Sequence, residues 1–295
     1  VKKTTDLLPL LFASQGTLGV ITEVILRCEL LPAEPQHMIA TFNTIRTAIE
    51  FMKFVRTLDP LEVNLYDTRI LQAAEAHGKK PTLLTHKLHA GFAVLISFND
   101  HPRVSKRKLK RCLKQLPAST FAVVQDEDNA PDFQDLDNAV ISYLNDDTHG
   151  ERTPLVDDVE IPEDQLANFL TKLKELEQKT KSELPLYGSF TASNYSVRPE
   201  LQLESVSGRQ FALKFLKDYT KLVREHGGLI TGGSPEGQVK AMVTDLPTEQ
   251  KELYGKIKDL FDPRHILGPE VKLGARPRTT IRHMRASYNN HIITE

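Results

Sequence analysis

Short apolar runs alternate along the chain with longer segments in which apolar residues recur every three or four positions. This alternation predicts strands followed by helices. A first strand is expected over residues 20–30, ending at Pro32 and Pro35. Later strands are expected in the runs HMIATF, LEVNLYD, FAVLISF, TFAVV, PLVDDVEIP, LPLYGSFTASNYSV and LITGG. Helices are expected over residues 44–58, 69–77, 103–116, 136–144, 163–179, 205–226 and 248–261. Pattern alone allows a parallel doubly wound sheet or an α+β layer with antiparallel strands.

Two glycines, Gly16 and Gly19, stand between apolar runs in the segment FASQGTLGVIT, residues 12–22. Because glycine lacks Cβ, the backbone there is free to adopt positive φ or to lie against another surface. On local pattern alone, this segment is typical of an ordinary turn that leads into a strand.

Composition indicates a soluble globular protein large enough for a substantial core or two domains, with 295 residues of which 40% are hydrophobic and 26% charged. The net charge of −1 gives no overall attraction to nucleic acid or anionic lipid. No apolar run approaches the roughly 18–20 residues of a membrane span, and the first residues do not resemble a signal peptide. Cys28 and Cys112 form no metal or disulfide motif, which fits a reducing, cytoplasmic location.

A basic stretch covers residues 103–114 and leaves two interpretations open. It is either a nucleic-acid or lipid patch, or the solvated side of an amphipathic helix. Leu109, Cys112, Leu113 and Leu116 have the spacing of one helix face, which favours the second interpretation. The tail, residues 275–295, is basic and is expected to be disordered or to form an arm that packs on a partner.

Residues 12–22 resemble the signature GSEGTLGIIT that ends the FAD-binding domain of flavin-linked oxidases. The family is the D-lactate and glycolate dehydrogenase branch of the vanillyl-alcohol oxidase superfamily. Three later segments resemble further motifs of this family in the same order: YGSFTASNYSVR (187–198), GGLITGGSPEGQVK (227–240) and FDPRHILGPEVK (261–272). Four ordered matches across nearly the whole chain are a more specific signal than any one of them.

The resemblance implies an α+β fold. Residues 1–35 would end a PCMH-type FAD-binding domain, residues 36–274 would form the cap or substrate domain, and residues 275–295 would be the basic tail. The cap is expected to be ferredoxin-like, an antiparallel sheet with helices on one face. The glycine-rich loop that holds the FAD pyrophosphate would lie in a missing N-terminal subdomain. An upstream FAD-binding segment or a second copy of the chain is therefore an expected partner.

The resemblance also implies site residues. The expected cofactor is FAD, with Ser14, Gly16, Thr17, Gly19 and Val20 near the flavin. The residues expected to face a small hydroxy acid or alcohol are Asn194, Arg198, Glu236 and Lys240. Arg198 is the best anchor for a carboxylate because its planar fork binds one bidentately, although a surface ion pair is an alternative. Glu236 is either a functional carboxylate or a solvated loop residue.

The chain departs from the family at four functional positions. Ser189 and Ser196 replace two metal-binding histidines, Gly233 replaces a glutamate ligand, and Ser234 replaces the histidine assigned as general base. A serine hydroxyl is a poor substitute for an imidazole ligand and holds no proton near neutral pH. We therefore expect no metal.

The expected function is that of the C-terminal part of an FAD-dependent oxidoreductase, with its electron acceptor left open. The alternative is a degenerate, non-catalytic cap domain that serves as a subunit or binding module. The four altered positions favour the alternative. The retained segments 12–22 and 261–267 favour the oxidoreductase, because they have no reason to keep a flavin-shaped sequence without a flavin.

Overall fold

The computed structural model describes residues 7–283, apart from residues 13, 29–33, 77–90, 119, 145–154, 231–232, 234 and 245. The chain divides into two compact units. Unit 1 contains the described residues of 1–29 and 233–285, and unit 2 contains those of 30–232. The expected tail lies mostly outside the described residues.

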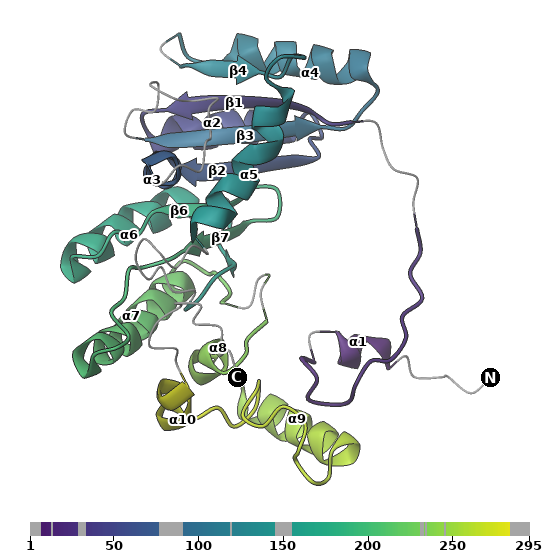
Figure 1. Ribbon diagram of the computed structural model, residues 1–295, viewed down its shortest axis with the longest axis vertical. Coiled ribbons are helices and arrows are strands. Elements are labelled where there is room, and N and C mark those ends of the chain that lie inside the picture. The colour runs from purple at the N-terminus through teal and green to yellow at the C-terminus, as the bar shows by residue number, and fades with distance from the viewer. Residues whose placement is uncertain are drawn as a thin grey trace, which may run out of the picture. The chain divides into compact units, whose positions relative to one another are not determined.

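Unit 2 is built on one seven-stranded sheet with the order β4-β1-β3-β2-β6-β7-β5 (Figure 1). Every neighbouring pair is antiparallel, which confirms the expected α+β fold and excludes the parallel sheet. The strands are β1 (Gln36–Phe42), β2 (Glu62–Asp67), β3 (Phe92–Phe98), β4 (Ala122–Val124), β5 (Val159–Glu160), β6 (Leu186–Ser189) and β7 (Asn194–Val197).

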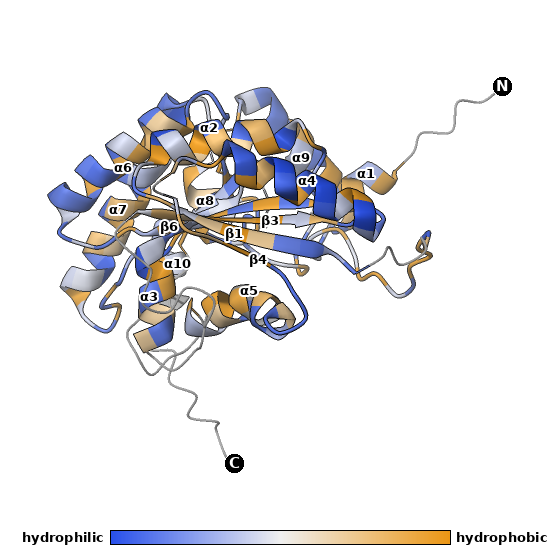
Figure 2. Cartoon of the chain, turned by 90° about the horizontal axis from the view of Figure 1, so that it is seen from above, coloured by the Kyte–Doolittle hydropathy of each residue, from blue (hydrophilic) through white to orange (hydrophobic). Residues whose placement is uncertain are grey.

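Helices cover both faces of the sheet rather than the one face expected (Figure 2). On the first face, Ile39 lies opposite Leu95 and packs in a buried cluster with α3 (Thr68–Ala76) and α5 (Ala130–Leu144). The second face packs against α2 (Ile45–Arg56) and α4 (Pro102–Gln115), and Phe42 of β1 contacts Phe51 of α2 at 5.2 Å between ring centroids. The physical reason is that β1 and β3 are apolar at successive positions, so both of their faces require burial.

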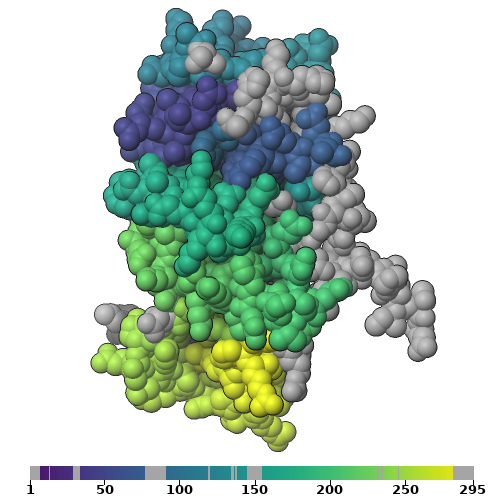
Figure 3. All heavy atoms as spheres, turned by 90° about the vertical axis from the view of Figure 1, so that its left-hand side faces the viewer, coloured from purple at the N-terminus to yellow at the C-terminus, as the bar shows by residue number. Residues whose placement is uncertain are grey.

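The helices of unit 2 begin and end near the expected residues, except that α5 begins at Ala130 and not at the expected residue 136. Helix α6 spans Leu166–Thr180, and α7 spans Val206–Glu225. Thr44 and Ser205 cap α2 and α7 by accepting hydrogen bonds from the backbone amides three residues on. Helices α6 and α7 pack together and form part of the surface in Figure 3. In α4, Leu109 and Cys112 are buried, which confirms that the basic stretch is an amphipathic helix.

Unit 1 contains α1 (Leu8–Leu11), α8 (Val239–Val243), α9 (Thr248–Phe261) and α10 (Pro277–His283). The strand expected over residues 20–30 is absent from the described part of that segment, where residues 19–28 form neither helix nor strand. Among the described residues, no helix is both long and apolar enough to cross a membrane.

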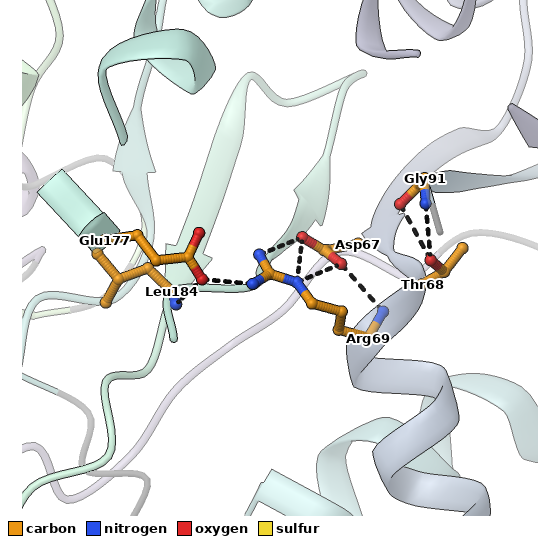
Figure 4. Close-up of polar contacts among 6 residues, drawn as sticks. All are labelled: Asp67, Thr68, Arg69, Gly91, Glu177 and Leu184. Atoms are coloured by element: carbon orange, nitrogen blue, oxygen red, sulfur yellow. Dashed lines mark hydrogen bonds and ion pairs between the residues drawn. The ribbon is translucent and has the colours of Figure 1, made fainter. Parts of the chain in front are cut away.

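An ion cluster joins the end of β2 to α6 (Figure 4). The Arg69 guanidinium donates to Asp67 from Nε and Nη2, at 3.0 Å to Oδ1 and 2.7 Å to Oδ2, and Nη1 donates to Glu177. Glu177 also accepts from the Leu184 amide at 3.1 Å, just before β6. These bonds, foremost those to Asp67, raise the pKa of Arg69. The cluster lines an open hollow of about 510 Å³. Through the bond from the Leu184 amide to Glu177, it also fixes the segment just before β6.

We predict that Arg69→Met lowers the free energy of unfolding by about 1 kcal/mol. Methionine keeps the aliphatic stem but leaves Asp67 and Glu177 without their shared cation. The loss of stability is small because the Arg69 side chain is 36% exposed. Urea unfolding measures the change. The control is Lys172→Met, which breaks a pair whose two side chains are more than half exposed and should cost less. Equal effects would contradict a special role for the Arg69 cluster.

Candidate functional site

The glycine turn of unit 1 is tight and partly buried. Gly16 has φ +73°, and Gln15 before it has φ +54°, so the expected positive φ is confirmed at Gly16. Thr17 closes the turn, because its Oγ1 donates to the Ser14 carbonyl at 2.6 Å and its amide donates to the same oxygen at 3.0 Å. Gly19 has neither positive φ nor a described neighbour where a Cβ would lie.

Lys258 ties this turn to the last motif. It lies on α9, is buried, and donates from Nζ to the Thr17 carbonyl at 2.6 Å and the Leu267 carbonyl at 2.7 Å. Its third acceptor is Asp262 Oδ2 at 2.6 Å, and Asp262 also accepts from the Leu267 amide at 2.8 Å. The bond from Lys258 lowers the pKa of Asp262 to about 2. The ammonium is therefore saturated by three acceptors and holds two distant segments together.

Glu236 forms a second tie within unit 1. Gln15 Nε2 donates to Glu236 Oε2 at 2.6 Å, and Gln15 Oε1 accepts from the Gly237 amide at 2.8 Å. Lys272 Nζ donates to both Glu236 oxygens, at 3.0 and 2.8 Å. Burial by itself raises the pKa of Glu236, but the bonds from Lys272 and Gln15 outweigh it and lower that pKa. An ionised carboxylate held in this way suits a positioning role better than proton transfer.

We predict that Lys272→Met raises the pKa of Glu236, because burial then acts against fewer opposing bonds. The loss of this partly buried pair should also cost about 1 kcal/mol of stability. A side-chain NMR titration of glutamate carboxyl carbons measures the pKa. Lys251→Met, at an exposed position on α9, is the control and should leave the Glu236 titration unchanged. An unchanged Glu236 titration in Lys272→Met would contradict the assigned contact.

A hollow of about 350 Å³ lies beside these ties in unit 1, within the size range of small-molecule pockets. Thr17 and Lys258 line it on one side, and residues 268–271 of the closing motif line it on another. Gly268 has φ +50°, and a Cβ there would lie 3.1 Å from Thr17 Cγ2. Glycine thus lets the closing motif approach the turn closely while leaving the hollow open.

The second motif forms a β-hairpin of β6 and β7 in unit 2, in which Ser189 lies opposite Asn194. Gly188 is required here, because a Cβ would lie 2.1 Å from the Asn194 carbonyl oxygen. Ser196 is buried, donates from Oγ to Asp158 Oδ1 at 3.1 Å and accepts from the Asp158 amide at 2.9 Å. The Ser196 hydroxyl therefore stabilises the loop before β5.

Arg198 and Tyr187 lie close to the same loop. Arg198 donates from Nε to Asp157 Oδ2 at 3.1 Å and from Nη1 to the Leu144 carbonyl at 3.3 Å. Its side chain is 15% exposed, so it is more than a surface ion pair. Tyr187 lies opposite Ser196, and burial together with nearby Asp157 raises the pKa of its phenol to about 12. Tyr187 is thus protonated at neutral pH and is able to donate a hydrogen bond.

Strand β5 connects the second motif to the start of the third. Glu160 lies opposite Asn194 of β7. On its other side, Glu160 exchanges two backbone hydrogen bonds with Leu229, at 2.8 and 2.9 Å. Gly228 allows this approach, since a Cβ there would lie 2.5 Å from the Glu160 carbonyl oxygen.

Comparison with known proteins identifies the family of the domain. The family described as FAD linked oxidases, C-terminal domain, matches residues 31–271. The chain belongs to this family. The resemblance seen in the four motifs is thereby confirmed, and the expected connection with FAD is confirmed at the level of the family.

Curated relatives of this FAD-oxidase domain are longer proteins. It is 23% identical to the glycolate oxidase subunit GlcD of Bacillus subtilis, over 90% of this chain and 56% of that protein. It is 26% identical to the D-lactate dehydrogenase of Anaerostipes hadrus, over 91% of this chain and 59% of that protein. The D-2-hydroxyglutarate dehydrogenase of Pseudomonas putida is 19% identical, with 88% of this chain and 27% of that protein covered. The chain thus spans little more than half of the first two relatives.

Solved structures share the fold of the FAD-oxidase domain at low sequence identity. A 4-ethylphenol oxidase from Gulosibacter chungangensis matches with a TM-score of 0.60 and 13% identity, over 85% of this chain and 56% of that one. An alkyldihydroxyacetonephosphate synthase matches with a TM-score of 0.55 and 15% identity, over 91% of this chain and 50% of that one. These matches support the fold and leave the substrate to other arguments.

The residues expected at the site divide between the two units of the chain. Unit 2 holds Asn194, which is half-buried in the hairpin, and Arg198. Unit 1 holds the other expected residues, namely Ser14, Gly16, Thr17, Gly19, Val20, Glu236 and Lys240. Lys240 is buried on α8, and Val20 is 79% exposed. Gly233 is exposed, and Ser234 lies outside the described residues.

Sequence reasoning missed Lys258, Gln15 and Tyr187. Lys258 and Asp262 are four residues apart at the end of α9, and this spacing is the signal that could have revealed their ion pair. Gln15 was visible inside the first motif, but its partner is 221 residues away. Within the described residues, no three His, Cys, Asp or Glu side chains gather as a metal site requires.

Proposed function

We propose that this chain provides the substrate-binding domain and one edge of the flavin site of an FAD-dependent oxidoreductase acting on a small 2-hydroxy acid. The proposal rests on one observation: hydrogen bonds link residues of three family motifs within unit 1. Lys258 bonds the glycine turn to the closing motif, and Gln15 bonds the same turn to Glu236. Glycolate, D-lactate and D-2-hydroxyglutarate, named for the relatives, are all 2-hydroxy acids, which supports that class of substrate.

The residues of unit 1 fit part of FAD rather than the whole cofactor. The hollow beside Thr17 and Gly268 is of small-molecule size, and Gly268 allows close approach of the closing motif to the turn. Lys258 has three protein acceptors, so it is not the cation that would meet a pyrophosphate. In our proposal, a glycine-rich loop in a preceding segment binds the pyrophosphate. When bound, FAD would supply the hydride acceptor for the substrate.

Arg198 and Tyr187 are the proposed substrate-binding residues of unit 2. Asp157 and the Leu144 carbonyl orient the Arg198 guanidinium, whose donors match a carboxylate. The Tyr187 phenol, with its pKa at about 12, stays protonated and would donate a hydrogen bond to a substrate oxygen. Asn194 lies at the turn end of the same hairpin and is proposed as a further polar contact. The small substrate is thus proposed to be bound by the Arg198 cation and by two neutral side chains, Tyr187 and Asn194.

The test is to express the chain together with whatever polypeptide sequence is encoded directly before it, and to measure flavin absorbance and oxidation of D-2-hydroxy acids with an artificial electron acceptor. Bound flavin with turnover of a hydroxy acid supports the proposal. Absence of flavin from a correctly assembled pair contradicts it. Flavin with turnover of simple alcohols alone would retain the enzyme class and reject the acid substrate.

One observation favours a second candidate, a non-catalytic module. Ser196 replaces a histidine, and its hydroxyl both donates to and accepts from Asp158, so it serves the stability of the hairpin. A protein that has converted this position to a structural one could keep the fold for assembly alone. A folded pair without bound flavin and without activity is the result expected for this candidate.

A further inference from the structure

The second motif belongs to a row of polar side chains on one face of the sheet in unit 2. Asn64 of β2 lies opposite Ser189 of β6, and Ser189 lies opposite Asn194 of β7. Asn194 in turn lies opposite Glu160 of β5. Residues directly opposite one another in an antiparallel sheet present their side chains to the same face. All four residues are half-buried, so they keep part of their surface exposed, as groups that bind a small molecule require.

The proposed reaction requires a proton acceptor. Oxidation of a 2-hydroxy acid removes the hydrogen on C2 as hydride, which the flavin takes, and the hydroxyl hydrogen as a proton. Arg198 is a cation, and the Tyr187 phenol, with its pKa at about 12, already holds its proton. Glu236 is occupied by its bonds to Gln15 and Lys272. The residues assigned so far therefore leave the hydroxyl proton without an acceptor.

A carboxylate suits this role, but three carboxylates on or beside the polar face are already bonded. Asp157 accepts from Arg198 at 3.1 Å, Asp158 accepts from Ser196 at 3.1 Å, and Glu62 accepts from Ser97 at 2.9 Å and from Asn64 at 3.3 Å. The Glu160 side chain makes no hydrogen bond or ion pair with any residue in the part of the chain that the structure describes. Of these four carboxylates, Glu160 is therefore the one with both oxygens available.

The backbone holds Glu160 in place from both sides. Strand β5 pairs with β7 on one side, and on the other Glu160 exchanges two hydrogen bonds with Leu229, whose side chain is 56% exposed. A group on such a fixed strand is positioned more precisely than a group on a loop. Tyr187 lies in the neighbouring row of the same face, opposite Ser196 and two residues from Ser189. Neighbouring rows are about 7 Å apart along a strand, a span that a small hydroxy acid and two side chains bridge.

We propose that Glu160 accepts the hydroxyl proton of the substrate, a role that the family resemblance gives to a histidine at the position of Ser234. This inference rests on the proposed function. The O–H bond of the substrate breaks and its proton passes to a carboxylate oxygen of Glu160, while the C2–H bond breaks and its hydride passes to the flavin. The electron pair of the O–H bond forms the C=O bond. The substrate is oxidised to a 2-keto acid, and the flavin is reduced.

The first measurement uses Glu160→Gln in the chain expressed together with whatever polypeptide sequence is encoded directly before it. Glutamine keeps the size of glutamate but accepts no proton, so kcat for a D-2-hydroxy acid should fall at least about a hundredfold. Affinity for 2-hydroxy-2-methylpropanoate should change less than about threefold. This acid has no hydrogen on C2, so it is bound without being oxidised, and equilibrium dialysis measures its binding.

Two further measurements distinguish a proton acceptor from a structural residue. In the parent protein, kcat/KM should fall as the pH is lowered, because protonated Glu160 accepts no further proton, and Glu160→Gln should lack this dependence. Glu160→Ala leaves room for a formate ion, and added formate should raise its kcat at least about tenfold. Glu160→Asp retains a carboxylate and should retain the pH dependence, so it tests the inference even if Glu160→Gln folds poorly.

The matched control is Glu62→Gln, which changes another half-buried carboxylate of the same face. The Glu62 oxygens accept from Ser97 and Asn64, so this substitution should leave kcat within about threefold of the parent value. Bound flavin per chain and thermal unfolding check that each variant is assembled and folded.

The outcomes separate this inference from the proposed function. Loss of kcat alone in Glu160→Gln, with rescue of Glu160→Ala by formate, supports the inference. An active parent and a Glu160→Gln variant with nearly the same kcat would overturn it and leave the function standing. Equal losses of kcat and of affinity for the inert acid, without rescue by formate, would overturn it by assigning Glu160 a structural role. An assembled parent without flavin and without hydroxy-acid oxidation would contradict both.

Discussion

Replacement of Arg198 by lysine is expected to lower kcat/KM for a 2-hydroxy acid about a hundredfold in the flavin-loaded protein. Arginine presents a planar fork of donors to a carboxylate, whereas lysine presents a single compact charge. Asp157 and Leu144 hold the guanidinium from one side, so its direction is fixed before substrate binds. Steady-state kinetics with a D-2-hydroxy acid and an artificial acceptor measures the effect.

Two controls distinguish substrate binding from structure. Arg209→Lys changes a half-buried arginine of α7 that donates to the Leu203 carbonyl before this helix, and it should leave kcat/KM unchanged. A simple alcohol without a carboxylate should be oxidised equally by the parent protein and by Arg198→Lys. An equal loss with acid and alcohol would show that Arg198 serves the fold rather than the substrate.

Replacement of Lys258 by methionine is expected to lower the midpoint of thermal unfolding by about 5–10 °C. The Thr17 and Leu267 carbonyls would lose their donor, and the Asp262 carboxylate would lose its cation. Differential scanning calorimetry measures the change. Lys256→Met on the exposed side of the same helix is the control and should have little effect. Adding Asp262→Asn to Lys258→Met should restore part of the loss, because the carboxylate charge is then removed.

The same pair predicts the pH dependence of stability. Lys258 lowers the pKa of Asp262 from 3.8 to about 2 in the folded protein. The pair therefore contributes its full stability above about pH 4, and the contribution is lost as the pH falls towards 2. Urea unfolding between pH 6 and pH 2 should show this loss in the parent protein and a smaller one in Lys258→Met. Parallel pH profiles would contradict the assigned pair.

The sequence predicted most of the helices because their ends carry strong local signals. The expected helix over residues 248–261 has the same bounds as α9, which begins after Pro247 and ends before Asp262 and Pro263. The long helix over residues 205–226 likewise matches α7, with Ser205 as its cap. Local chemistry was sufficient at these positions because Pro247 and Pro263 mark the ends of α9 and Ser205 caps the start of α7.

The strands were harder to predict from the sequence. Their antiparallel pairing came from the resemblance rather than from the pattern. The run at residues 184–197 was expected as one stretch, but it folds into a hairpin with Ser193 at φ +57° in its turn. Residues 20–26 have a strand sequence but no strand partner in the described chain. Pairing depends on distant residues, and a local pattern does not identify them.

In the candidate site, too, the sequence did not identify contacts between residues that are far apart along the chain. The motifs located Thr17, Glu236 and Arg198, but they did not indicate that Lys258 binds the Thr17 carbonyl across 241 residues. The role of Glu236 also depended on contacts, because its lysine partner is 36 residues away. Side-chain type suggested a functional carboxylate or a solvated loop residue at Glu236, whereas its bonds to Gln15 and Lys272 became visible only in the structure.

The short strand β5 has a consequence for protein engineering. The backbone of Glu160 pairs with Asn194 on one side and with Leu229 on the other. Strand β5 therefore lies between the hairpin and the segment that contains Gly227 and Gly228. Suppose that only the β6–β7 hairpin of a relative is transferred into this chain, in order to change substrate specificity. The strand that then pairs with Glu160 would come from the relative, while Glu160 itself would not. The smallest exchangeable module is therefore discontinuous: it comprises the hairpin, β5 and residues 227–229, transplanted together.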